Sequence, residues 1–457
     1  MSLFTLSSVK PKKLLIITSS GGGGLIQTAN AKEQEERALD PDVSIIRIDI
    51  LEDWLGKTFG RFCSGSWNRA QIRGDVRTLR FLSSFQFLLD YFLWPYFFLR
   101  ALFVLFGEEI DRVIDTQIFA TSAVLKALRI YNRRRGKQVC LQKVLVDLPT
   151  KAAKHFFRPI KNLTPTDRSS LQLMTIAPLL EEGQTAEEFW QTHCGLSDKE
   201  VHYHDGCVRQ AFKKYRHRQR DGKFFSLSIR FKNGEELELI QKCLKRGSLQ
   251  TSVQNGEILI SLPPEDRMVT VLLGSQPAKE ATFNYVKGFL QTIKEDPSLK
   301  SPVHLFVFCA EHSPKQKTLF CEVAEYVSEV GKDLSHFTVV PFSFQNEETV
   351  ASLFHRSDLT CTRSGGQTAM ELMCVGSGQI CVHSEAKKDP RKNEDPSLQE
   401  LLKGILGWEA ASALYLQKAC DAKIVTPETI LSCFKEIVSS KVLRAHKKAE
   451  KSLPVPR

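Results

Sequence analysis

The sequence predicts an α/β protein built from two Rossmann-like domains, because strand-length apolar runs alternate with helical stretches in both halves of the chain. The first half opens with the apolar run Leu14–Thr18, four glycines and a helical stretch over 25–39. The second half repeats this order, with a predicted strand over 269–273, a glycine-containing loop and a helix over 279–294. Such alternation predicts parallel sheets whose binding sites lie at the carboxyl ends of the strands.

The composition is that of a globular protein with anionic partners. The chain has 457 residues, enough for two or three domains, with 42% hydrophobic and 25% charged residues. An excess of 63 Lys and Arg over 52 Asp and Glu gives a net charge of +11, which favours phosphates or an anionic membrane surface. The basic residues are dispersed and no recognition module is found, so we expect no nucleic-acid partner.

The cysteines and the amino terminus predict a cytoplasmic location. Twelve cysteines occur without a CxxC pair, which is typical of buried thiols in a reducing compartment. No apolar segment of the kind found in secretory signals precedes the first predicted strand. We therefore expect a cytoplasmic protein, associated with membranes only peripherally.

The remaining elements predict four parts of the chain. Residues 1–215 form an N-terminal Rossmann-like acceptor domain, with further strands over 43–48 and 143–148. Residues 216–265 form a linker or insertion, which begins within a basic run over 212–223. Residues 266–425 form the C-terminal Rossmann-like donor domain, with strands over 303–309, 338–341 and 359–362 and helices over 319–330 and 347–355. Residues 426–457 form a terminal helix and a basic tail.

Residues 81–106 are rich in aromatic side chains and contain three residues that a membrane span disfavours. The segment holds Asp90, Pro95 and Arg100 among phenylalanines, tyrosines and a tryptophan. Because buried charges and a proline are costly within a span, we expect a helix pair or a broken helix in a membrane interface. The alternative is a helix pair in the core of a large domain.

The stretch from Cys361 to Leu372 has the residue types of a nucleotide-diphosphate site. Gly365 and Gly366 let the backbone approach a phosphate, and a helix beginning near Thr368 would direct its positive end at the anion. Glu371 would lie about one turn into that helix, where a carboxylate can accept two hydrogen bonds from a ribose diol. On spacing alone, a structural strand-turn-helix joint remains an alternative.

Several ordered segments of the second half resemble the carboxy-terminal domain of GT-B glycosyltransferases. They are Gly274-Ser275-Gln276 after a strand, Val340-Pro341-Phe342 at a strand end, and Asp358 to Glu371. The resemblance is to the group containing the lipid II-forming N-acetylglucosaminyltransferase and monogalactosyldiacylglycerol synthase. The first half is similar to the same family at Gly21–Gly24, 146–150 and 208–212.

This resemblance implies a GT-B fold, with two Rossmann-like domains facing across a cleft, and transfer from a UDP-sugar to a lipid or lipid-linked acceptor. It implies inversion by direct displacement, and neither a cofactor nor a metal, because loop N–H groups and a helix dipole stabilise the leaving diphosphate. By position, Glu371 binds the ribose. The donor-binding residues implied are Arg209, Ser275, Gln276, Arg363, Ser364, Gly365, Gly366, Gln367, Thr368 and Glu371, and the acceptor loop is Gly21, Gly22, Gly23 and Gly24.

One position departs from the family pattern. The first glycine loop of the family is often followed by a histidine, which can act as a general base, whereas here Leu25 follows Gly24. A leucine cannot take a proton, so we expect Asp147 or His155 to activate the acceptor. Two alternatives stay open: a catalytically inactive GT-B scaffold that binds a nucleotide, and a nucleotide-sugar epimerase.

Overall fold

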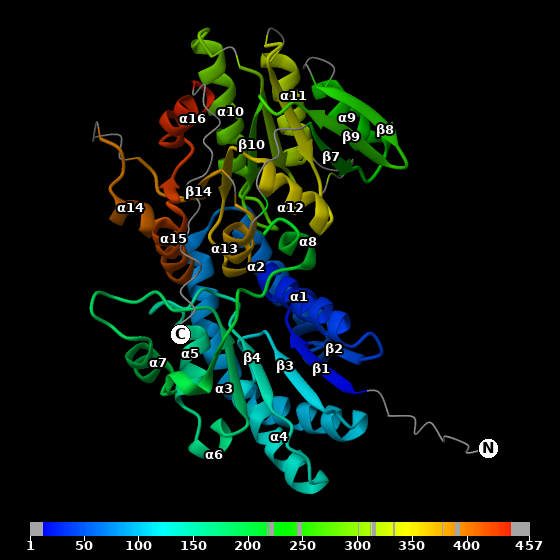
Figure 1. Cartoon of the computed structure of the whole chain (residues 1–457), viewed down its shortest axis with the longest axis vertical. Coiled ribbons are helices and arrows are strands. Elements are labelled where there is room, and N and C mark those ends of the chain that lie inside the picture. The colour runs from blue at the N-terminus through cyan, green and yellow to red at the C-terminus, as the bar shows by residue number, and fades with distance from the viewer. Residues whose placement is uncertain are drawn as a thin grey trace, which may run out of the picture. The chain divides into compact units, whose positions relative to one another are not determined.

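Figure 1 shows the computed structural model of the chain, which forms two compact units. The structure describes residues 12–216, 218, 224–244, 249–299, 301–310, 312, 317–331, 334–376, 378–388 and 394–439. Among these, the first unit comprises residues up to Ser64 together with Ser84–Pro149 and Ala153–Cys207. The second unit comprises Gly65–Ser83, Thr150–Ala152 and the chain from Val208 onward. The predicted basic tail and most of residues 217–223 lie outside the described residues.

The first unit is built on a six-stranded parallel sheet with strand order β2-β1-β3-β4-β5-β6. Its strands are β1 (Lys13–Thr18), β2 (Ser44–Asp49), β3 (Arg112–Asp115), β4 (Leu141–Val144), β5 (Leu171–Thr175) and β6 (Val201–Tyr203). The helices in this part of the chain are α1 (Gly23–Leu39), α2 (Lys57–Ile72), α3 (Val76–Glu108), α4 (Thr121–Arg135), α5 (Lys154–Lys161), α6 (Pro165–Arg168) and α7 (Ala186–Cys194), with a short π-helix over Ile50–Trp54 and a 3-10 turn over Asp198–Glu200.

Both faces of this sheet are buried. Successive side chains of a strand point to opposite faces, and in β1 both sets lie in a core cluster. Leu14 and Ile16 of β1 pack in one cluster with residues of α1. Leu15 and Ile17 pack in the other cluster, with residues of α3, α4, α5 and α7. Helix α3 therefore belongs to the layer opposite α1, and one of its sides is part of the core.

The second unit contains a six-stranded parallel sheet with strand order β12-β11-β10-β13-β14-β15. Its strands are β10 (Arg267–Leu272), β11 (Val303–Phe308), β12 (Phe337–Phe342), β13 (Leu359–Thr362), β14 (Gln379–His383) and β15 (Lys423–Val425). Counted along this unit, the order is 3-2-1-4-5-6, that of the Rossmann fold. The predicted fold class of two Rossmann-like domains is thus confirmed by two parallel sheets.

The helices of the second unit surround this sheet, and a small antiparallel sheet is added to it. The helices are α8 (Gln210–Lys213), α9 (Gly234–Leu244), α10 (Lys279–Glu295), α11 (Leu319–Val330), α12 (Glu347–Arg356), α13 (Gly366–Val375), α14 (Leu398–Lys403), α15 (Gly407–Cys420) and α16 (Ile430–Ser439). The small sheet has the order β7-β9-β8, from β7 (Phe225–Arg230), β8 (Gln250–Gln254) and β9 (Glu257–Leu262). Helix α9 connects it to α11, and α10 lies beside α16 (Figure 1). The segment predicted as a linker or insertion is therefore largely folded.

The domain boundary differs from the predicted one in residues 65–83, 150–152 and 208–215, which were assigned to the first domain and belong to the second unit. Trp67 stacks on Trp408 with ring centroids 6.4 Å apart, and Leu79 packs against Leu406. Arg80 Nη2 donates to the carbonyl oxygen of Lys403 at 3.0 Å. The corner between α2 and α3 is thus held by α14, α15 and their connecting loop.

The aromatic segment forms a single helix, so the expectation of a helix pair or broken helix is wrong. Helix α3 runs through 33 residues and contains Pro95. A proline inside a helix removes one hydrogen bond and disfavours the preceding turn. Burial of Phe97, Ala101 and Leu105 against the sheet stabilises the helix beyond this point.

Candidate functional site

The two predicted donor loops lie where the second sheet reverses its strand order. Strands β10 and β13 are parallel neighbours, so the loops that follow them leave the same edge of the sheet. Gly274 in the first loop has a left-handed φ of +82°, and a Cβ there would lie 3.8 Å from Arg363 Cδ in the second loop. Ser275 is exposed and Gln276 is half-buried beside it. Ligands of open parallel sheets bind at such a reversal.

Helix α13 begins directly after the second loop, at Gly366, two residues before the predicted start. Gly365 is its N-cap, no side chain caps it, and its first turn contains no acidic residue. The first N–H groups of such a helix are donors, and its dipole attracts an anion. Thr368 in the first turn is half-buried and adds a hydroxyl. The phosphate that the motif predicts at Gly365, Gly366 and Thr368 stays a prediction.

The predicted ribose ligand Glu371 is buried and paired with Arg209. Arg209 Nε donates to Glu371 Oε1 at 2.7 Å, and Nη2 donates to Oε2 at 3.0 Å. Gln367 Nε2 also donates to Oε1, at 3.0 Å. Three residues predicted to bind the donor therefore contact one another in the free protein, although 162 positions separate Arg209 from Glu371. Their roles toward a donor stay predictions.

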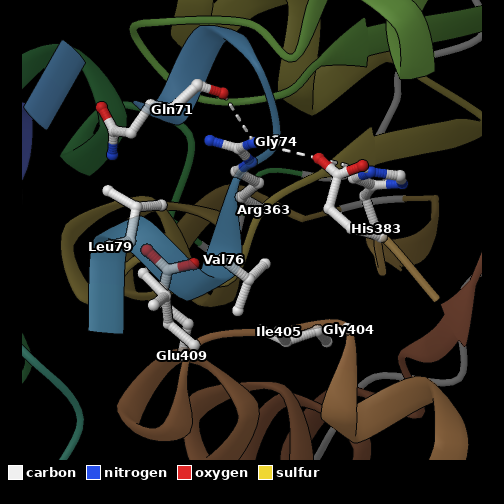
Figure 2. A pocket seen from close by; sticks show the side chains of 11 residues that line it. Gln71, Gly74, Val76, Leu79, Arg363, His383, Gly404, Ile405 and Glu409 are labelled. Atoms are coloured by element: carbon white, nitrogen blue, oxygen red, sulfur yellow. Dashed lines mark hydrogen bonds and ion pairs between the residues drawn. The ribbon is translucent and has the colours of Figure 1, made fainter. Parts of the chain in front are cut away.

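Arg363 and Ser364, also predicted to bind the donor, have protein partners in the structure. Ser364 is buried, and its Oγ donates to the carbonyl oxygen of Glu409 at 2.7 Å. Arg363 Nη2 donates to the carbonyl oxygen of Gln71 at 3.1 Å and to Glu385 Oε1 at 3.2 Å (Figure 2). Their contacts hold the loop after β13 to α15 and to the corner between α2 and α3.

A small pocket lies against this loop, and Figure 2 shows the side chains that line it. Glu385 lies between Arg363 and His383, whose Nε2 is 3.3 Å from Glu385 Oε1. Burial acts to raise the pKa of Glu385, but the contacts with His383 and Arg363 outweigh it and hold that pKa below its ordinary value. Gly74 has a φ of +64°, and a Cβ there would lie 2.5 Å from Glu385 Oε1. Only glycine fits this approach without displacing the carboxylate. Glu385 and His383 were not predicted from the sequence, because the strand β14 that ends at His383 was not recognised.

The predicted acceptor loop lies at the reversal of strand order in the first sheet. Gly21 and Gly22 follow β1, and Gly23 and Gly24 begin α1, while the order reverses between β1 and β3. The Gly21 N–H donates to Ser19 Oγ at 3.1 Å. The side chain of Leu25 packs against the core cluster of the sheet. Leu25 is thus a packing residue.

The two residues predicted to activate the acceptor are in direct contact. Asp147 follows β4, and His155 lies in the first turn of α5. The distance from His155 Nε2 to Asp147 Oδ2 is 2.7 Å, and both side chains are partly accessible, at 13% and 14%. A carboxylate that accepts from one ring nitrogen of a histidine orients the ring for proton transfer through the other.

A buried cluster near the carboxyl ends of β3 and β4 was missed in the sequence. Lys143 Nζ donates to Asp115 Oδ2 at 2.8 Å and to Thr121 Oγ1 at 2.9 Å, and also to the carbonyl oxygen of Gln117. Burial raises the pKa of Asp115, against the opposing effect of Lys143. A lysine at the start of the apolar run over 143–148 was the available signal.

Asp90, Trp94 and Arg100 of α3 form hydrogen bonds with other residues of the first unit. Asp90 Oδ1 accepts from the Ala120 N–H at 2.7 Å, at the start of α4. Arg100 Nη2 donates to the carbonyl oxygen of Asp53 at 3.0 Å, and Trp94 Nε1 donates to Ser122 Oγ at 2.9 Å. The charges that argue against a membrane span in the sequence therefore have partners within the protein.

Another face of α3 displays apolar side chains. Residues Leu88–Glu108 are long and apolar enough to cross a membrane by length and composition. Seven large side chains in the first-unit part of α3 are 40% to 77% exposed, and most recur at spacings of three and four, which place them on one face: Phe85, Leu88, Tyr91, Phe92, Tyr96, Leu99 and Phe103. We call these residues the α3 apolar face.

Comparison with known proteins finds similarity among solved structures. No family model matches the chain, and no curated protein matches it. The chain is similar to MurG from Acinetobacter baumannii, with 13% identity over 96% of this chain and 97% of that one and a TM-score of 0.41. It is similar to UDP-GlcNAc 2-epimerase from Neisseria meningitidis bound to UDP-GlcNAc, with 11% identity over 97% and 94% and a TM-score of 0.44.

The lipopolysaccharide outer core galactosyltransferase WaaB is a further neighbour, with 11% identity over 94% of this chain and 90% of that one and a TM-score of 0.38. The solved structures to which the chain is similar thus include a galactosyltransferase and UDP-GlcNAc 2-epimerases, at TM-scores of 0.38 to 0.44.

Proposed function

We propose that this protein is a glycosyltransferase that moves a hexose or an N-acetylhexosamine from a UDP-sugar to a membrane-associated acceptor. The observation that carries the proposal is the reversal point of the second sheet. There, a helix without a side-chain cap begins at Gly366 and places the carboxylate Glu371 about one and a half turns further on. An anion site followed by a buried carboxylate matches the diphosphate and the ribose of a nucleotide sugar.

The proposed reaction is a direct displacement with inversion at the anomeric carbon. The acceptor hydroxyl oxygen forms the new bond to this carbon, its proton passes to the Asp147–His155 pair, and the bond to the diphosphate breaks. The leaving UDP carries the negative charge that develops. We propose that the α13 N-terminus stabilises this charge in place of a divalent metal.

The α3 apolar face supports the proposal of a membrane-associated acceptor. A helix with an apolar face of aromatic residues, anchored on its other side to a folded domain, suits the plane of a membrane interface. Asp90 and Arg100 each form a hydrogen bond within the protein, so interfacial contact would leave these bonds intact. The net charge of +11 favours an anionic surface.

The role of Glu371 predicts that binding depends on the ribose 2′-hydroxyl. We expect the wild-type protein to bind UDP more tightly than 2′-deoxy-UDP by about ten- to 150-fold, the worth of a hydrogen bond to a charged group. In Glu371→Ala, and in Glu371→Gln, which keeps the side-chain volume, this preference should largely disappear. Calorimetric titration with the two nucleotides measures it.

Glu348→Ala is the matched control, since Glu348 is exposed on α12 and its ion pair is with Lys214 at 3.6 Å. This variant should keep the full preference for UDP. Equal affinities for both nucleotides in the wild-type protein would show that no carboxylate reads the ribose, and would contradict the proposed site.

The α3 apolar face predicts direct binding to anionic vesicles. Replacing Phe92 and Phe103 by serine should lower the vesicle partition coefficient by roughly tenfold or more, because two exposed aromatic rings lose their contact with lipid. Both rings are largely exposed, so the fold should be unaffected. Leu39→Ser, an equally exposed apolar position on α1, is the control. Equal sedimentation of all three proteins with vesicles would exclude α3 as the contact surface.

A further inference from the structure

We infer that in the free protein Arg209 blocks the carboxylate of Glu371, the proposed ribose ligand, and that the diphosphate of an incoming donor draws Arg209 away. We call this ion pair the latch. The inference rests on the proposed function, because it takes Glu371 and the α13 N-terminus as the binding site of a nucleoside diphosphate. It adds a specificity to that site, which is discrimination against nucleosides that carry no phosphate.

The carboxylate of Glu371 is not available to a ligand in the free protein. The Arg209 guanidinium uses Nε and Nη2 on both oxygens, at 2.7 and 3.0 Å, so it occupies the edge where the two oxygens face one partner. A ribose diol would use the same edge to reach both oxygens. Glu371 is only 3% exposed. Nucleoside binding at Glu371 therefore requires the ion pair to open first.

The surroundings of Arg209 hold its side chain in place, while they allow the guanidinium to change its hydrogen-bond partner. Its Cζ lies 4.7 Å from the centroid of the Phe212 ring, and a second carboxylate oxygen, Glu347 Oε2, lies 3.9 Å from its Nε. The ring supports the guanidinium plane and leaves its edge to bind an acceptor. Gln367 keeps its own bond to Glu371 Oε1 at 3.0 Å, so the carboxylate stays oriented when Arg209 leaves.

A diphosphate is the ligand chemistry that can open the latch. Phosphate oxygens accept bidentate hydrogen bonds from arginine as carboxylates do. Gly366 and Glu371 are five residues apart on α13, about 7.5 Å along the axis, so a phosphate at the helix start is bonded to a ribose near Glu371. The diphosphate of UDP thus becomes the new partner of Arg209 when the ribose of UDP binds Glu371, the previous partner. Uridine offers no anion, and its affinity is reduced by the small fraction of protein in which the latch is open.

The test is the affinity of Arg209→Ala for uridine and for UDP, measured by calorimetry with the full chain. We expect uridine to bind about fivefold or more tighter than to the wild-type protein, because no latch has to open. UDP loses the contact between its phosphate and Arg209, but it no longer has to open the ion pair with Glu371. Its affinity should therefore rise less than that of uridine, or fall. The dissociation constant for uridine divided by that for UDP should therefore be lower in the variant than in the wild-type protein.

Two further variants keep the result interpretable. Arg209→Lys retains a positive charge beside Glu371 but cannot form the bidentate fork, so uridine should gain affinity by a smaller factor even if the alanine variant is unstable. Lys214→Ala removes an exposed charge from the same segment, paired with Glu348, and should change neither affinity.

Uridine affinity that is unchanged or lower in both Arg209 variants would overturn the latch. A phosphate contact without a latch would weaken UDP alone, and a structural role would weaken both ligands. Failure of the proposed function differs from both outcomes, because the wild-type protein would then show no Glu371-dependent preference for UDP over 2′-deoxy-UDP.

Discussion

Asp147→Asn should lower the rate of sugar transfer by about 10²- to 10⁴-fold while leaving UDP affinity within a few-fold. The amide keeps the shape of the carboxylate but cannot orient and charge-stabilise the His155 ring, which lies 2.7 Å away. His155→Ala should have an effect of similar size, since the two residues act as one unit. Release of UDP from the donor in the presence of anionic liposomes measures transfer, and calorimetry measures UDP binding.

Lys154→Ala is the control for the Asp147–His155 pair, because Lys154 is exposed at the neighbouring position of α5. It should transfer sugar at the wild-type rate. Normal transfer by Asp147→Asn would remove Asp147 from the mechanism. A parallel loss of transfer and of UDP affinity would indicate a structural defect.

Lys143→Met should destabilise the first unit by about 3–5 kcal/mol, because it leaves the carboxylate of Asp115 buried without its ion partner. Lys143 is 1% exposed and Asp115 is fully buried. Since a chain with two units need not unfold in one step, hydrogen exchange of the β3 and β4 amides is the suitable measurement.

The double variant Lys143→Met with Asp115→Leu should recover much of the lost protection, because no buried charge remains unpaired. Protection that is lost equally in the single and the double variant would show that the ion pair itself, and not the unpaired charge, stabilises this edge of the sheet.

The elements of the second unit were largely predictable from sequence. The predicted bounds of β13 and α11 agree with the structure residue for residue, because each apolar run is bordered by residues that end an element. In the first unit, β4 ends at Val144, although the apolar run continues to Leu148. Leu145, Val146 and Leu148 are buried beyond the end of the strand, and an apolar run alone does not distinguish burial from strand pairing.

The course of α3 was not predictable from local sequence. A proline and two charges in an apolar segment indicate an interruption, whereas in the structure Asp90 and Arg100 bond to residues that are distant in sequence. The same holds for the corner at Gly74, whose fit against Glu385 depends on a contact across more than half of the chain. Such tertiary contacts override local preference.

The candidate donor site was predictable in its parts but not in its pairing. The glycines, the start of α13 and the position of Glu371 follow from the motif. The ion pair between Arg209 and Glu371 does not follow from the motif. The two residues are 162 positions apart, and only the packing of α8 against α12 and α13 brings them together.

Release of UDP from a panel of UDP-sugars by the purified full chain, with and without anionic liposomes, tests the proposed transferase activity. We expect that one sugar is turned over and that liposomes carrying a lipid acceptor stimulate the release. Binding of UDP without release from any sugar would favour an inactive scaffold, and epimerisation of a UDP-sugar without transfer would favour an epimerase. A protein that neither binds UDP nor releases it from any donor would exclude the proposed donor site.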